Sequence, residues 1–196
     1  MRETLTQGLP ALGVDTKYIE QLEDFSTMLV EKNKVMNLTG ITEPREVATL
    51  HLLDSLSLLP IAPLSGKKIV DVGTGAGFPG VPLKIVLPES HVTLLDSLNK
   101  RIDFLQESCD ALGLSDVDCV HARAEEFGHR EEYDYAVSRA VAALPVLCEL
   151  CLPLIKVGGE FLAMKSSHTE DEINAAKAAI KLLGGEISEV IDYTIP

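Results

Sequence analysis

This sequence of 196 residues has no apolar run long enough to span a bilayer, and its first residues lack the apolar segment of a secretory signal peptide. Cysteine is scarce, and the four present are compatible with reduced thiols. Only Cys148 and Cys151 lie close together, in an apolar stretch without a second pair or a histidine at zinc spacing, so we interpret them as core residues. We therefore expect a cytoplasmic protein with no metal site and no membrane partner.

Basic residues are in short supply as well. There are 17 lysines and arginines against 30 aspartates and glutamates, which gives a net charge of −13. Non-specific binding to nucleic acid usually requires a basic surface. Several basic residues nevertheless fall near the ends of predicted strands, so the composition leaves open a local basic rim on an acidic body.

The stretch that organises the chain is KKIVDVGTGAGFPG, residues 67–80. Its β-branched run ends at Asp71 and is followed by glycines at 73, 75, 77 and 80, which predicts a strand, a tight loop and a helix, the kind of turn at which a ligand approaches the backbone. An ordinary helix-capping turn is the alternative, because such glycine patterns are common. Asp71 disfavours a pyrophosphate at this turn and favours a cationic ligand, and S-adenosylmethionine carries an ammonium and a sulfonium.

Strands and helices alternate strictly after residue 66, whereas residues 1–66 show two helical patterns, from residue 15 to about 32 and from about 44 to 59. The predicted strands are 67–72, 91–95, 117–121, 133–138, 159–164 and a last one at 186–194. The predicted helices between them are 79–87, 98–112, 141–155 and 170–183. This alternation indicates an α/β fold with a parallel, doubly wound, Rossmann-like sheet and helices on both faces. We expect 1–66 to be a helical extension packed on the core and 67–196 to be the S-adenosylmethionine-binding domain.

Ligands of such sheets bind beyond the carboxyl ends of the strands, so the residues there are the candidates for a cofactor site. After the first strand these are Asp71, Gly73, Thr74, Gly75, Gly77 and Phe78. Asp96 follows the second strand, about twenty residues after the glycine loop, where a carboxylate can accept both hydroxyls of a ribose. It is also a candidate helix N-cap. Together with the loop, it indicates an adenosine-type site.

The later strands add further candidates. Ala124, after the third strand, could lie against an adenine, and Glu125 fits either a cofactor contact or a first-turn helix acid. Arg139, at the end of the fourth strand, fits either a surface ion pair or recognition of a phosphate or base edge at the mouth of the pocket. The candidates for RNA contact are Lys32, Lys34, Asn37, Arg123 and Lys165. Residues 37–40 also fit an ordinary connection between helices.

Two motifs are absent from the end of the fourth strand. There is no Asn/Asp-Pro-Pro-aromatic sequence of the kind found in methyltransferases that act on exocyclic base amines, and no cysteine nucleophile for methylation of carbon. A ring nitrogen such as guanine N7 carries an in-plane lone pair and no proton. It needs alignment and exclusion of water, and no general base, so we expect Arg139 to act by positioning.

The chain resembles the bacterial 16S rRNA guanine-N7 methyltransferases, also called the glucose-inhibited division protein B family. The matching motifs are NLT at 37–39, HLLDSL at 51–56, DVGTGAGFPG at 71–80, LLDS at 94–97 with KR at 100–101, RAEE at 123–126 and SRA at 138–140. The resemblance implies methyl transfer from S-adenosylmethionine to N7 of a guanine in the decoding-region loop of 16S rRNA, as RNA or within the small ribosomal subunit. It also implies a class I methyltransferase fold. The same resemblance implies that five residues contact the cofactor or line its pocket, namely Gly73, Phe78, Ala124, Glu125 and Arg139, and that Asp96 binds the ribose.

Three other functions remain as alternatives. A small-molecule methyltransferase of the same fold is disfavoured by the basic residues at strand ends and by the family motifs. An NAD-dependent oxidoreductase is disfavoured by Asp71 and by the alternate-residue glycines. A nucleotide-binding module would bind the cofactor without moving a methyl group. We expect the protein to be a monomer.

Overall fold

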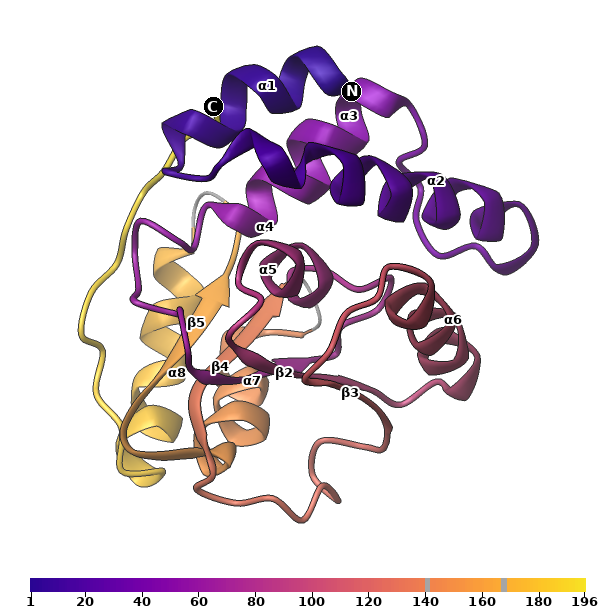
Figure 1. Ribbon diagram of the computed structural model, residues 1–196. Helices are drawn as coiled ribbons and strands as arrows, with labels where there is room; N and C mark the ends of the chain where they lie inside the picture. Colours follow the sequence, from indigo (N-terminus) through magenta and orange to yellow (C-terminus); the bar gives the residue numbers. More distant parts are fainter. Residues whose placement is uncertain (140–141, 167–168) are drawn as a thin grey trace.

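The centre of the fold is a five-stranded parallel sheet with the order β3-β2-β1-β4-β5 (Figure 1). The structure is a computed structural model that describes residues 1–139, 142–166 and 169–196. The strands are β1 (Lys68–Val72), β2 (His91–Asp96), β3 (Val117–His121), β4 (Tyr133–Arg139) and β5 (Ile155–Met164). The central strands β1, β2 and β4 are buried along most of their length, as expected of parallel strands that are covered on both faces.

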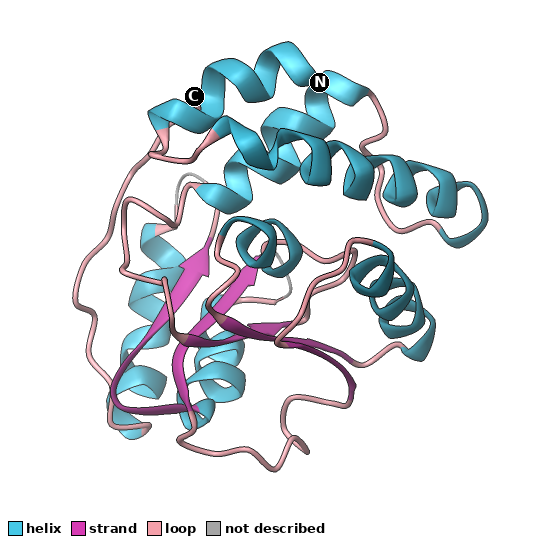
Figure 2. Ribbon diagram, viewed as in Figure 1, coloured by secondary structure: helices cyan, strands magenta, loops and turns pink. Residues whose placement is uncertain are grey.

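Helices cover both faces of the sheet (Figure 2). One face carries α5 (Gly80–Val86) and α6 (Asn99–Ala111), and the other carries α7 (Leu144–Cys151), the short 3-10 turn η3 (Leu152–Leu154) and α8 (Glu170–Leu182). The strand residues divide between these faces by alternation, since Ile69 belongs to the core under α5 and Val70 to the core against α7. The predicted Rossmann-like architecture with helices on both faces is confirmed.

The first 56 residues form a helical layer over α5 (Figure 1). Its elements are α1 (Arg2–Ala11), the 3-10 turn η1 (Thr16–Tyr18), α2 (Ile19–Met36), α3 (Pro44–Val47), the π-helical turn η2 (Ala48–Leu53) and α4 (Asp54–Leu56). Phe25 of α2 packs against Phe78 and Phe104 with ring centroids 5.6 and 6.4 Å apart, so this layer and the sheet share one hydrophobic core. The division of the chain at residue 66 stays a prediction.

The strand predicted at 186–194 is wrong, since residues 185–196 have no regular secondary structure. A strand exists only where its backbone groups pair with a neighbour, and no pairing is formed between this segment and β5. The segment instead runs back towards the N-terminal helices, where the Tyr193 hydroxyl donates to Asp54 Oδ1 at 2.8 Å (Figure 1).

The helix predicted at 141–155 is shorter than expected. It ends at Cys151 because Pro153 has no N–H to continue the hydrogen-bond pattern, and Ile155 already pairs with Tyr133 in the sheet. The predicted first residue, 141, lies outside the described residues. None of the described helices combines the length and the apolar character that crossing a bilayer requires.

Candidate functional site

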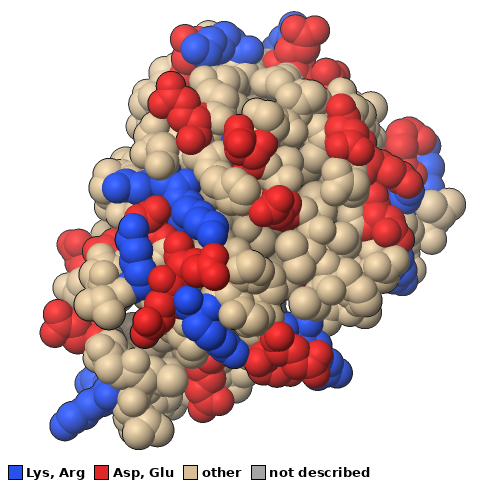
Figure 3. All heavy atoms as spheres, turned by 60° about the horizontal axis from the view of Figure 1, so that its bottom comes forward, with Lys and Arg blue, Asp and Glu red and all other residues tan. Residues whose placement is uncertain are grey.

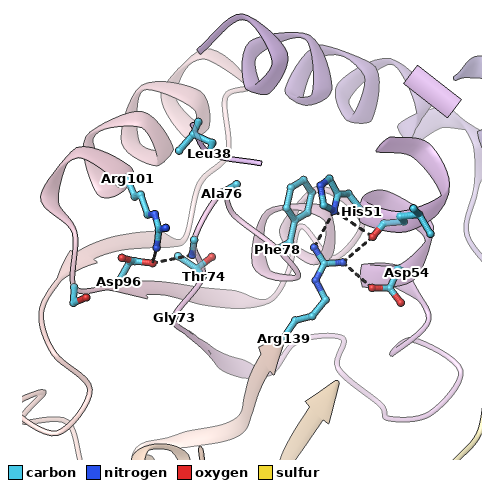
Figure 4. A pocket seen from close by; sticks show the side chains of 13 residues that line it. Leu38, His51, Asp54, Gly73, Thr74, Ala76, Phe78, Asp96, Arg101 and Arg139 are labelled. Carbon is cyan, nitrogen blue, oxygen red and sulfur yellow. Dashed lines mark hydrogen bonds and ion pairs between the residues drawn. The ribbon is translucent and has the colours of Figure 1, made fainter. Parts of the chain in front are cut away.

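A cavity of about 610 Å³ lies at the carboxyl ends of the strands, between the sheet and the N-terminal helices (Figure 4). β1 is flanked by β2 on one side and β4 on the other, so the strand order reverses here, and such a switch point is where open α/β sheets bind ligands. A second cavity of about 190 Å³ adjoins it and shares Gly73, Asp96 and Ser97 with it. The first cavity is lined by Leu38, Leu50, His51, Asp54, Gly73, Thr74, Gly75, Ala76, Phe78, Asp96, Ser97, Arg101 and Arg139.

The glycine loop is held against the end of β2. The backbone N–H groups of Gly73 and Thr74 donate to Leu95 O at 2.8 and 3.0 Å, and Gly75 N donates to Asp96 Oδ2 at 2.9 Å. Gly75 has a φ of 60°, in the left-handed region that favours glycine. This conformation turns the loop along the floor of the cavity, which Gly73, Thr74 and Gly75 line.

Asp71 and Gly77 support the loop from below and line neither cavity. Asp71 is fully buried, and its Oδ2 accepts from Gly80 N at 2.8 Å at the start of α5. Burial raises the pKa of this carboxyl to about 6, against the hydrogen bond from Gly80, which lowers it. A Cβ on Gly77 would lie 2.8 Å from both Leu105 and Val81 side-chain carbons, so this glycine permits close packing. A direct contact of either residue with a cofactor stays a prediction.

Asp96 lies where both cavities meet and is almost completely buried. Its Oδ1 accepts from Leu98 N at 2.9 Å, and its Oδ2 accepts from Gly75 N at 2.9 Å and from Arg101 Nη1 at 3.2 Å (Figure 4). The carboxylate therefore fixes both the glycine loop and the start of the following helix while it faces the cavities. The second cavity continues past it to Ala124 and Glu125, which were predicted as cofactor contacts.

Arg139 lies on the opposite side of the first cavity from Asp96 (Figure 4). Its Nη1 donates to Asp54 Oδ2 at 2.7 Å and to Leu50 O at 3.1 Å, and its guanidinium carbon lies 5.1 Å from the centroid of the Phe78 ring. The side chain is 16% exposed, so these partners hold it in a half-buried position. Arg139 is thus a fixed positive group on the cavity wall. It contacts Phe78, which was also predicted as a cofactor-site residue.

His51 connects Arg139 to the loop after α2. Its ring stacks on Phe78 with centroids 4.5 Å apart and planes at 19°, and its Nδ1 lies 3.2 Å from Arg139 Nη2. Nδ1 also lies 3.2 Å from Leu50 O, but that carbonyl already accepts from Arg139 Nη1 at 3.1 Å. Because arginine can only donate, we assign Nδ1 as an acceptor and place the proton on Nε2, which then donates to Thr39 Oγ1 at 2.8 Å. Burial, together with the charge of Arg139, lowers the pKa of His51 to about 4, so the imidazole is neutral at physiological pH.

The residues predicted to contact RNA lie outside the first cavity, and only Arg123 lines the second. Asn37 has a φ of 49° and ends α2. The four basic candidates are each paired with a carboxylate: Lys32 with Glu107 (2.7 Å), Lys34 with Glu31 (2.7 Å), Arg123 with Glu125 (3.3 Å) and Lys165 with Glu172 (2.8 Å). Acidic and basic side chains are interspersed on the face drawn in Figure 3 as well. A strongly basic rim is therefore not formed by these side chains.

Among the cavity residues that were not predicted as site residues, three have ionisable side chains, namely His51, Asp54 and Arg101. A signal was present, since His51 and Asp54 are polar residues three apart in a leucine-rich helical stretch, which places them on one face. Within the described ranges, His, Cys, Asp and Glu side chains form no group of three or more that could hold a metal ion.

Comparison with known proteins gives relatives over almost the whole chain. A family model described as rRNA small subunit methyltransferase G matches residues 18–194. A protein named Ribosomal RNA small subunit methyltransferase G from Alkaliphilus metalliredigens is 50% identical over 199 residues, which cover 98% of this chain and 83% of the relative. A protein of the same name from Staphylococcus saprophyticus is 48% identical over 198 residues, with shares of 98% and 83%.

Solved structures share the fold at low sequence identity. A SAM-dependent methyltransferase from Aquifex aeolicus has a TM-score of 0.58 at 17% identity and covers 83% of this chain and 92% of its own. A SAM-dependent O-methyltransferase from Thermotoga maritima has a TM-score of 0.54 at 16% identity, with 79% and 55% covered. These likenesses confirm the predicted methyltransferase fold class.

Proposed function

The chain belongs to the rRNA small subunit methyltransferase G family, and we propose that it methylates N7 of a guanine in the decoding-region loop of 16S rRNA. The observation that carries the proposal is the pair of joined cavities at the switch point of the sheet, with Asp96 at their junction and Arg139 on the far wall. The methyl donor in this proposal is S-adenosylmethionine, and the acceptor is 16S rRNA or the small subunit.

The residues of the two cavities suit an adenosine-containing cofactor. Asp96 would hold the ribose, because a buried carboxylate at this place can accept hydrogen bonds from both hydroxyls. The smaller cavity beside Ala124 and Glu125 would hold the adenine, and Gly73 and Thr74 would line the path towards Arg139. When bound, S-adenosylmethionine supplies an electrophilic methyl group.

Proton transfer is not required of the chain's own residues in this reaction. Guanine N7 is a lone-pair nucleophile without a proton, and both ring nitrogens of His51 are already engaged, by Thr39 and Arg139. A bidentate contact of Arg139 with O6 and N7 of the guanine would block the reacting lone pair. We therefore assign Arg139 to positioning the cofactor and, with Phe78, to shaping the wall against which the base docks.

Methyl transfer to small ribosomal subunits from cells lacking this protein tests the proposal. The purified protein and labelled S-adenosylmethionine should place label in 16S rRNA, and chemical cleavage at N7-methylguanine followed by mass mapping should locate it in the decoding-region loop. Label in a fraction of small metabolites, with none in RNA, would instead support the small-molecule methyltransferase. Cofactor binding without any transfer would support the nucleotide-binding module. We expect the reaction to occur in the cytoplasm and the protein to act as a monomer.

A further inference from the structure

The carboxylate of Asp96 is already occupied by three donors. Leu98 N donates to Oδ1, while Gly75 N and Arg101 Nη1 donate to Oδ2, at 2.9, 2.9 and 3.2 Å. Arg101 also forms an ion pair with this carboxylate, which is 3% exposed in its side chain. In this structure Arg101 therefore occupies the Asp96 carboxylate, which the proposed function assigns to ribose binding.

The count of hydrogen-bond sites shows that this arrangement is incompatible with a ribose bound through both hydroxyls. A carboxylate offers about four acceptor positions, and three donors leave about one of them for two hydroxyls. Gly75 N and Leu98 N belong to the backbone of the loop and of the turn before α6, so they cannot leave without moving both elements. Arg101 is held by its side chain alone and is 35% exposed there, so it is the donor that can leave.

Arg101 lies in the first turn of α6 and lines the larger cavity, reaching from the helix onto Asp96 (Figure 4). Once released, its guanidinium would be unpaired at the edge of the cavity. Lys32 and Lys165, in contrast, are paired with carboxylates that line neither cavity. A free guanidinium binds phosphate oxygens well, because its planar fork matches their geometry. The RNA backbone is the phosphate source that this site would meet.

We propose that cofactor binding displaces Arg101 from Asp96 and turns it towards an RNA phosphate, so that the cofactor-loaded protein binds RNA more tightly than the free protein. This inference rests on the proposed function, because it requires an adenosine cofactor at Asp96 and an RNA acceptor. Coupling of this kind is reciprocal, so RNA raises cofactor affinity by the same factor. Arg101 therefore opposes cofactor binding when RNA is absent.

Calorimetry with S-adenosylmethionine tests whether the cofactor competes with Arg101 for Asp96. Arg101→Met keeps much of the aliphatic stem and removes the charge, and we expect it to bind cofactor about two- to fivefold more tightly than wild type, the scale of a partly exposed ion pair. Arg2→Met is the matched control, since Arg2 pairs with Glu23 in the same way but lies on α1, away from both cavities. It should leave the affinity unchanged. Weaker binding by Arg101→Met would overturn the inference, because Arg101 would then support the cofactor.

Filter binding of an unmodified small-subunit rRNA transcript tests whether the cofactor raises RNA affinity through Arg101. The assay is run with and without S-adenosylhomocysteine, which has the same ribose and no methyl group to transfer. In wild type the homocysteine compound should raise RNA affinity and steepen its log–log salt dependence by about 0.7, the value for one additional phosphate contact on single-stranded RNA. In Arg101→Met both effects should disappear, whereas Arg2→Met should retain them. Two results would overturn the proposed RNA contact of Arg101: an equal rise of RNA affinity in wild type and Arg101→Met, or no RNA binding by wild type with S-adenosylhomocysteine bound.

The methylation assay on small subunits separates this inference from the proposed function. If the wild-type protein methylates guanine N7 but Arg101→Met binds the cofactor more weakly, the proposed role of Arg101 is refuted and the proposed function stands. Tighter cofactor binding by Arg101→Met with no methylation of RNA by wild type refutes the proposed function and leaves Arg101 as a residue that competes with the ribose.

Discussion

Arg139, the last residue of β4, donates a hydrogen bond at 2.7 Å to Asp54, which lies 85 positions earlier in the chain. The side chains of both residues are 16% exposed. Leu50 and His51, from the same short helical stretch as Asp54, supply the other acceptors for this arginine. The N-terminal helices therefore form one wall of the candidate site, and the sheet forms the other.

Arg139→Ala should reduce methyl transfer to small subunits by about a hundredfold or more, because a fixed positive group on the cavity wall is lost. The variant should still fold, with a free energy of unfolding lower by about 1–3 kcal/mol, since Asp54 and Leu50 O lose their shared donor. Single-turnover methylation and urea denaturation measure the two effects. Arg2→Ala serves as the control for loss of an arginine, and wild-type turnover by Arg139→Ala would remove this residue from the site.

Asp96→Ala should weaken binding of S-adenosylmethionine by about 1–3 kcal/mol, the scale of hydrogen bonds to a charged group. Calorimetry measures the change in dissociation constant. Asp103→Ala, on the exposed side of α6, is the matched control and should bind the cofactor like wild type. An unchanged dissociation constant for Asp96→Ala would place the ribose elsewhere.

Asp71 should make the protein less stable as pH rises. Its pKa is about 6 in the folded state against an ordinary 3.8, so the folded state binds more protons between these two values. Stability from this group is fully present below pH 4 and is lost as pH rises through 6, by an amount on the order of 3 kcal/mol. Asp71→Asn keeps an acceptor for Gly80 N and should lack this loss, as urea denaturation at a series of pH values would show. Parallel pH profiles of the two proteins would contradict the raised pKa.

His51 should have the opposite effect over nearly the same range. Its folded-state pKa is about 4 against an ordinary 6.5, so the unfolded state binds more protons between these values. Its contribution to stability is present above pH 6.5 and is lost as pH falls towards 4. The profile of His51→Gln relative to wild type should therefore diverge below pH 6.5, where removal of the imidazole reduces the acid sensitivity. A constant difference between the two profiles at all pH values would contradict a lowered pKa of the partly buried His51.

Gly77→Ala should destabilise the fold by about 2–4 kcal/mol, from backbone strain together with overpacking. Gly77 has a φ of 100°, and an added Cβ would meet Leu105 and Val81 at 2.8 Å. Gly66→Ala is the control, because it shares a positive φ of 69° but its Cβ would meet no atom within 4 Å. It should cost only about 1 kcal/mol. Similar thermal unfolding of the two variants would show that packing at Gly77 is unimportant.

The sheet and its ligand-binding edge could be predicted because their signals are local. The buried strands are short apolar runs, the loop after β1 carries its glycines in sequence, and Asp96 follows its strand directly. The alternation of strands and helices predicts a parallel sheet, so the carboxyl ends of the strands lie at the same edge. Gly73, Thr74, Gly75, Phe78, Asp96 and Arg139 consequently line the first cavity as expected.

The remaining features depend on contacts between distant parts of the chain. The hydrogen bond from Arg139 to Asp54 joins two segments that are far apart in the chain, and no local sequence pattern predicts that they meet. The pairing of Lys32 with Glu107 joins α2 to α6 and removes a charge that the sequence alone shows as free. The segment at 186–194 contains β-branched and aromatic residues typical of a strand, but strand formation requires a neighbouring backbone as well as propensity.

The π-helical turn η2 sets the rotational phase of α4, the short helix that begins at Asp54. A π turn accommodates an extra residue without breaking the helix, and such insertions often occur at functional sites. Deleting one residue from this turn would allow an uninterrupted α-helix and would rotate every following side chain by about 100° relative to Pro44. The helix would survive, but the Asp54 carboxylate would no longer face Arg139. The length of this stretch is therefore under a constraint that composition does not reveal, so a residue can be exchanged there more safely than it can be removed.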